Sequence, residues 1–287
     1  MLVNGADCSI IIKTKHREMD IPYSDETLRE AFFYLKEEPP IEGDGVCKGI
    51  RKTDGIKGCV VTPLTINTAP LLLYLAMGAC GSPVFISETK NLFKYQLNLL
   101  PMEDTEFFDV LQDRLHERLL FLNCRVQSFE LRIMRNETIK LKIDILGTMS
   151  PLVYSPYDDY NREKGERFMG NNVTYKINGK ENSNIYGVTL VSKKQGGTET
   201  EIWIKRALKQ GEEIPSVIED LTITATLLLD KYEYRYFGMF YVKIKKLVLV
   251  ADVTEINTSN SVLGELRYYV SGGVSCDVFT SGEENIP

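Results

Sequence analysis

The sequence predicts a mainly β protein, an antiparallel β-barrel or sandwich with two peripheral helices. After Leu122, apolar and polar residues alternate over several runs, which is the period of a half-buried strand. Short polar or glycine-containing segments separate these runs, as they do in antiparallel hairpins. Helical spacing is clear only in two earlier segments, 25–37 and 70–77, so we expect the helices to lie at the edge of the β-structure.

The first part of the chain predicts a short strand at Ser9–Ile12 and then an amphipathic helix at Asp25–Glu37. Ser24 is a suitable helix cap, and prolines at positions 39 and 40 would end the helix. Four apolar residues support this helix by their spacing: Leu28, Ala31, Phe32 and Leu35. A glycine-containing loop follows, and it matches neither a dinucleotide nor a P-loop motif.

The next segment predicts a strand at Gly55–Leu64 and a buried helix at Pro70–Met77. Pro70 suits the first turn of that helix and Gly78 its end. Residues 107–120 are ambiguous, because apolar residues four apart favour a helix. The family resemblance described below favours extended structure there, and we interpret the segment as strands.

The strongest local signal is a β-hairpin between residues 128 and 145. Two runs with period two are joined by the polar segment 135–137, which predicts that one face is buried. The predicted core of this hairpin consists of Phe129, Leu131, Ile133, Leu141 and Ile143.

Further strands are expected in the C-terminal half, beyond an exposed loop at 151–170. Segments 188–191, 201–204, 221–227 and 274–278 have strand patterns. In the run that begins at Phe240, strict alternation would bury Lys246. A β-bulge near Lys245–Lys246 would restore the apolar phase from Leu247 onward.

Composition is that of a folded protein that needs no metal or disulfide to be stable. The chain has 287 residues, 43% of them hydrophobic, and a net charge of −6, which disfavours tight nucleic-acid binding. We expect one β-domain at 43–280, preceded by an arm and helix at 1–42 and followed by a loose tail at 281–287. No segment resembles a secretory signal or is long enough to span a bilayer, so synthesis in a cytoplasm is expected.

The sequence lacks a set of residues for catalysis or for a cofactor. Its two histidines, His16 and His116, lie in no nucleophile or metal motif, and the six cysteines form no CxxC pair. The acidic pairs at 103–104 and 212–213 have the pattern of solvated loops. We therefore expect no enzyme, no metal and no cofactor.

Tyrosine-rich segments are candidates for an interface or for stacking on a sugar or base. In an acidic protein, packing across strands or an interface is the favoured interpretation. The candidate interface residues are Tyr157, Asp158, Asp159, Tyr160, Tyr232, Tyr234 and Tyr236.

Two stretches resemble the tail tube proteins of long-tailed bacteriophages. The first is a glycine-punctuated strand and an apolar helix, Gly55–Leu64 and Ala69–Gly78. The second is the run from Asn123 to Gly147, which contains Cys-x-Val-x-Ser-Phe-x-Leu and then an alternating strand ending in glycine. Asn123 stands where the family pattern has glycine. The resemblance is specific only between Gly55 and Gly147.

The resemblance implies a structural subunit of the virion tail, made in the bacterial host. Such subunits form stacked rings, commonly hexamers, that enclose the tape-measure protein, meet a tail terminator and conduct DNA during ejection. The lumen would then be neutral or negative, with Lys243, Lys245 and Lys246 away from it. A tube protein of a secretion or contractile system, and a β-sandwich module that binds a sugar or peptide, remain the alternatives.

Overall fold

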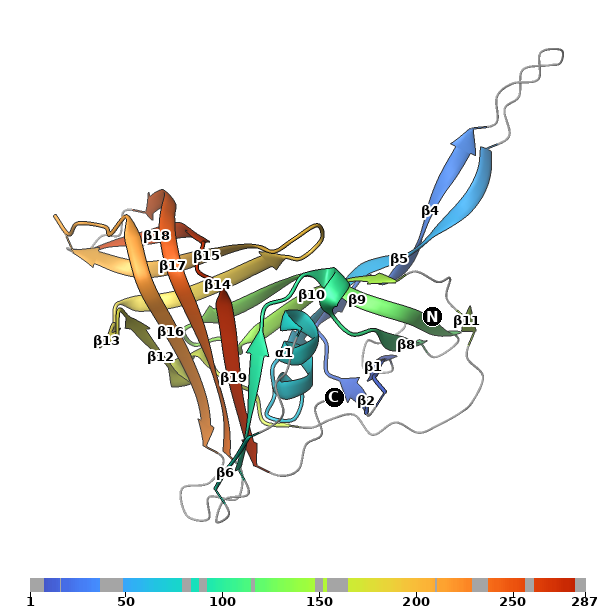
Figure 1. Ribbon diagram of the computed structural model, residues 1–287, viewed down its shortest axis with the longest axis horizontal. Coiled ribbons are helices and arrows are strands. Elements are labelled where there is room, and N and C mark those ends of the chain that lie inside the picture. Colours follow the sequence, from blue (N-terminus) through green and yellow to red (C-terminus); the bar gives the residue numbers. More distant parts are fainter. Residues whose placement is uncertain are drawn as a thin grey trace.

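The computed structural model describes residues 8–15, 17–36, 49–78, 84–87, 92–114, 117–147, 152–153, 165–209, 211–228, 237–255 and 261–281. Over these residues the chain forms nineteen β-strands and one α-helix, with the strands paired antiparallel in one large sheet (Figure 1). The predicted mainly β fold is therefore confirmed. The sheet does not close into a barrel, and one of the two predicted helices is absent.

Seven long or medium strands form the first layer of the sheet. In spatial order they are β4 (Arg29–Lys36), β5 (Gly49–Pro63), β10 (Lys140–Gly147), β9 (Glu117–Met134), β14 (Ile185–Lys193), β15 (Glu199–Lys209) and β18 (Ser261–Val270). A short strand, β3 (Asp25–Glu26), also pairs with β5.

The second layer faces the first across the core. Its order is β6 (Val84–Ser87), β7 (Leu92–Asn98), β19 (Val274–Ser281), β17 (Phe237–Glu255), β16 (Val217–Leu228), β12 (Val173–Ile177) and β13 (Lys180–Glu181). The later half of β17 also pairs with β18, so the two layers are continuous at that corner.

A smaller group of strands extends the sheet at the N-terminal side. It contains β2 (Glu18–Ile21), β1 (Cys8–Lys13) and β8 (Phe108–Arg114), which pairs with the first half of β9, while β11 (Leu152–Val153) pairs at Leu119–Leu120 of β9. Residues 108–114 and 117–120 are therefore extended, as we interpreted them, and not helical.

The prediction of a helix at Asp25–Glu37 is wrong. This segment instead forms β3 and β4, both of which pair with β5. Its apolar spacing fits a helix, but aromatic residues such as Phe32, Phe33 and Tyr34 favour extended structure, and β5 pairs with most of the segment. Pairing with a distant strand has overridden the local pattern.

The single helix of the described residues, α1 (Ala69–Met77), fills the space between the two layers. It contacts β9 on one side and β7 and β19 on the other, and all nine of its residues are buried. Pro70 lies in its first turn, and Gly78 ends it with a φ of 121°. A side chain at Gly78 would meet Leu100, so glycine is required here for conformation and for space.

The β9–β10 hairpin forms the centre of the first layer. Leu141 lies opposite Leu131 and Ile143 opposite Phe129, and the five predicted core side chains of this hairpin are buried. On the other face Arg132 is exposed, whereas Glu130, Lys140 and Lys142 are half-buried. Alternation along both strands thus gives the layer one apolar and one polar face.

The phase change expected at Lys245–Lys246 is present at a bend in β17. Lys246 has a φ of 52°, both lysines are exposed, and Leu247 returns to the core. The pairing with β16 stays in register across this point, because β16 changes phase there too, with Ile218 and Leu221 both buried. The left-handed backbone of Lys246 therefore accompanies the change of phase, and the pairing with β16 contains no β-bulge at this point.

Candidate interaction surfaces

The bend in β17 turns a row of apolar side chains toward solvent. Val217, Val248 and Tyr269 are neighbours across β16, β17 and β18, and their exposed fractions are 44%, 42% and 42%. We call these three residues the apolar row. Val250, the next outward residue of β17, is 56% exposed. Large apolar side chains aligned on adjacent strands are typical of a surface that contacts another protein.

A fixed cluster of side chains borders the apolar row on β15 and β18. The guanidinium of Arg267 donates two hydrogen bonds to the Glu201 carboxylate, at 2.9 and 2.7 Å. The same guanidinium lies 5.8 Å from the centre of the exposed Trp203 ring. Hydrogen bonding and the cation–π contact hold these side chains in one arrangement, as at the rim of an interface.

A second exposed apolar segment lies at the other end of the sandwich, on β6 (Figure 1). Val84, Phe85 and Ile86 are consecutive, and all three are exposed. Among the described strands β6 pairs with β7 alone, and Phe85 packs edge-on against Phe93 at 5.2 Å. An apolar edge strand of this kind is a site for contact with another chain.

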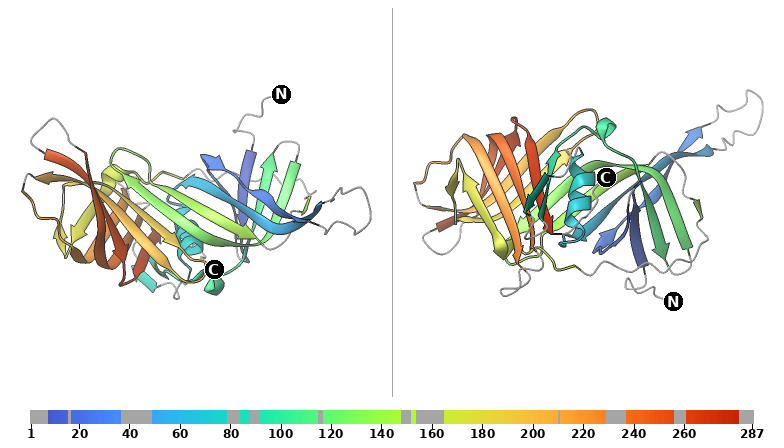
Figure 2. Two further views of the ribbon diagram at one scale, coloured as in Figure 1. Left: turned by 90° about the horizontal axis from the view of Figure 1, so that it is seen from above. Right: turned by 60° about the horizontal axis from the view of Figure 1, so that its bottom comes forward.

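The third feature is a two-stranded ribbon formed by β4 and the first half of β5. Figures 1 and 2 show it reaching away from the body of the molecule. Within the part of the chain that the structure describes, β4 pairs with β5 only. A two-stranded ribbon is marginal by itself in water, so contact with another surface would stabilise it.

Lys194 connects the end of α1 to the β14–β15 loop. Its side chain is fully buried, and Nζ donates hydrogen bonds to the carbonyls of Ala76 at 2.8 Å and Met77 at 3.3 Å. Burial lowers the pKa of this ammonium to about 8. The lysine caps carbonyls that the helix itself leaves without partners, which makes its role structural.

Among the described residues, two cysteines and the acidic pairs considered above lie in surroundings that can be stated. Burial raises the pKa of the Cys124 thiol to about 12 and that of Cys276 even further, so neither is a thiolate near neutral pH. Glu103 and Asp104 are exposed, and Glu212 is paired with Arg206. Across the described ranges, no group of three acidic, histidine or cysteine residues could hold a metal ion.

Several residues singled out in the sequence fall outside the described ranges. These are both histidines and every candidate interface residue: His16, His116, Tyr157, Asp158, Asp159, Tyr160, Tyr232, Tyr234 and Tyr236. Their interpretation stays a prediction.

Sequence reasoning missed both exposed apolar surfaces, although the chain contains a signal for each. Three consecutive apolar residues at 84–86 cannot all face one side of a strand. The phase change at Lys246 also turns Val248 and Val250 outward once Leu247 is placed in the core.

No model of a known protein family matches the chain, and no curated protein shows significant similarity to it. In the described residues, no helix is both long and apolar enough to cross a membrane.

Proposed function

We propose that this protein is a structural subunit that assembles with copies of itself, in the manner of a phage tail tube. The apolar row carries the proposal, because it places three large apolar side chains in solvent on adjacent strands. Exposed apolar surfaces at two ends of one molecule favour head-to-tail contacts, and such contacts give rings when they close and filaments when they do not.

The segments that carry the resemblance to tail tube proteins are neighbours in the fold, which supports this proposal. β10 pairs with both β5 and β9, and α1 packs against β9. Asn123, which departs from the expected glycine, has a φ of 52°. Asparagine adopts this left-handed conformation more readily than most residues, so the substitution keeps the local geometry.

In the proposed assembly the subunits form stacked rings, with six subunits as the expected number. The tube would enclose a tape-measure protein, end at a tail terminator and conduct DNA as transient cargo. The function then lies in surfaces between subunits and needs no catalytic group.

The test is the size of the purified protein as concentration rises. We expect light scattering after gel filtration to show oligomers, and negative-stain microscopy to show rings or tubes. Val248→Asp should reduce assembly, because it places a carboxylate in the apolar row. Thr174→Asp is the matched control, since it changes an exposed strand residue outside that row.

Circular dichroism of both variants would show whether they keep the β fold. A wild-type chain that stays monomeric at all concentrations would contradict assembly and favour the binding-module alternative. Equal loss of assembly in both variants would instead show that the apolar row is not specifically part of the interface.

A further inference from the structure

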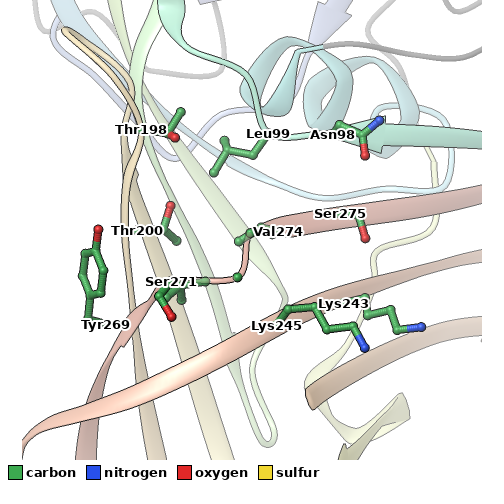
Figure 3. Close-up of a pocket in the computed structure, with 13 residues that line it drawn as sticks. Asn98, Leu99, Thr198, Thr200, Lys243, Lys245, Tyr269, Ser271, Val274 and Ser275 are labelled. Atoms are coloured by element: carbon green, nitrogen blue, oxygen red, sulfur yellow. The ribbon is translucent and has the colours of Figure 1, made fainter. Parts of the chain in front are cut away.

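A polar hollow of about 440 Å³ lies where the second layer bends toward the first. The bend of β17 forms one wall of the hollow, and the turn at 271–273 between β18 and β19 forms another part of its lining. Figure 3 shows Asn98 and Leu99 at the end of β7, and Thr198 and Thr200 from the β14–β15 region, around the same space. Its size is within the range of small-molecule sites.

Among the described residues, the lining of this hollow contains hydrogen-bond donors and two cations but no carboxylate. Its charged or polar side chains are Asn98, Thr198, Thr200, Lys243, Lys245, Tyr269, Ser271 and Ser275. The formal charge of these side chains is positive, although the whole protein is acidic. Ammonium, hydroxyl and amide donors together are the groups that bind oxyanions.

Lys243 is the residue whose charge is not compensated. Asp220, on the neighbouring strand β16, forms an ion pair with Lys245 at 3.1 Å. Asp277, on the other neighbour β19, forms one with Lys94 at 2.7 Å. Among the described residues Lys243 has no ion pair, and it is half-buried. A cation in this position gains from a bound anion more than a fully solvated lysine would.

We propose that this hollow binds a small oxyanion, a phosphate or a carboxylate group, with Lys243 as its counter-ion. Ser275 lies directly opposite Lys243 in the β17–β19 register, and Asn98 lies opposite Ser275 on β7. These three side chains therefore form one row across three strands at the mouth of the hollow. The proposal is separate from self-assembly, although Tyr269 lines the hollow and also belongs to the apolar row.

Isothermal titration of the full chain with pyrophosphate and, separately, with citrate at low ionic strength tests the proposal. We expect saturable binding of at least one anion at one site per chain. Lys243→Gln should weaken this binding at least tenfold. Lys180→Gln removes the same charge from an exposed position on β13, away from the hollow, and should leave binding within twofold.

Ser275→Asp provides a second test that keeps Lys243 in place. The new carboxylate would lie opposite Lys243, supply its counter-ion and exclude the bound anion, so binding should fall at least tenfold while thermal stability is retained. Tighter binding of pyrophosphate assigns the site to phosphates, and tighter binding of citrate assigns it to carboxylates. Absence of saturable binding, or equal weakening by Lys180→Gln and Lys243→Gln, would overturn the proposal.

Discussion

Asn123 holds a backbone conformation that most side chains avoid. It lies near the point where one edge of β9 passes from pairing with β8 to pairing with β14, its φ is 52°, and its backbone N–H donates to the Asp109 carboxylate at 2.9 Å. Glycine would adopt the same conformation without a Cβ penalty, whereas alanine would not.

We expect Asn123→Gly to leave stability nearly unchanged and Asn123→Ala to lower the free energy of unfolding by about 1–2 kcal/mol. Urea unfolding of the two variants beside the wild type measures this difference. Equal stability of the alanine and glycine variants would mean that the left-handed backbone is not maintained at this residue.

Lys194 makes stability depend on pH in the alkaline range. Its pKa is about 8 in the folded chain, because burial penalises the charged form, against an ordinary value of 10.5. Between these values the unfolded chain binds more protons, so the contribution of Lys194 to stability should increase as the pH rises from 8 to 10.5. The increase should be on the order of 3 kcal/mol at most. The hydrogen bonds to the Ala76 and Met77 carbonyls stabilise the charged ammonium and so make this increase in stability smaller.

Urea unfolding from pH 7 to pH 10.5 tests this effect, with Lys194→Met as the reference. Methionine has similar length and does not titrate, so the stability difference between the two proteins isolates the lysine. Parallel stability curves for the two proteins would show that Lys194 does not titrate in this interval.

Some strands owe their conformation to the strands they pair with more than to their own sequence. β4 is extended because β5 pairs along its length, and the two halves of β9 have different partners, with β8 followed by β14 on one edge and β11 followed by β10 on the other. The loop at 151–170 is also tied at its end, since Glu166 accepts a hydrogen bond from Ile66 and Arg167 forms a bridge with Thr65. Changes to this loop should therefore preserve its length.

Replacing Tyr157–Tyr160 with Gly-Ser-Gly-Ser should leave a folded subunit that assembles poorly. Long polar loops in ring proteins commonly reach the next subunit, and tyrosines are favoured at interfaces. Circular dichroism and the unfolding midpoint measure folding, and light scattering measures assembly. Tyr186→Ser is the control, because Tyr186 is an exposed tyrosine elsewhere on the surface. Normal tubes from the loop variant would exclude this role.

For the molecule as a whole, net negative charge disfavours tight binding of DNA. The chain carries 40 acidic against 34 basic residues. Lys245 is neutralised by Asp220, and Lys243 faces the hollow at the corner of the sheet. In the proposed conduit, duplex DNA must not meet a row of uncompensated cations, because each neutralised phosphate adds salt-sensitive affinity.

We therefore expect the free subunit, and the tube that it is proposed to form, to bind duplex DNA no more tightly than the about 1–100 μM typical of non-specific binding. Filter binding at 50 mM and at 200 mM salt measures affinity and its salt dependence. Tight binding that falls steeply with salt would favour a basic lumen or a genuine role in nucleic-acid binding.

Elements whose local pattern fits only one kind of secondary structure could be predicted from the sequence. Alternation placed Phe129, Leu131 and Leu141 on one face of the β9–β10 hairpin, and proline and glycine placed the ends of α1. The phase change at Lys246 was also readable, because a lysine could not continue the apolar face. These signals are local, so they appear in a few consecutive residues.

Features that depend on distant partners could be found only in the folded chain. The segment at Asp25–Glu37 has the apolar spacing of a helix, yet it is extended where it pairs with β5. Hydrogen bonds to the backbone of β5 stabilise the extended form more than the apolar spacing stabilises a helix. The corner hollow joins strands from residues 98 to 275, and Lys194 reaches a helix more than one hundred residues away. Such contacts depend on how the layers fold over each other, and single-chain periodicity carries no information about that arrangement.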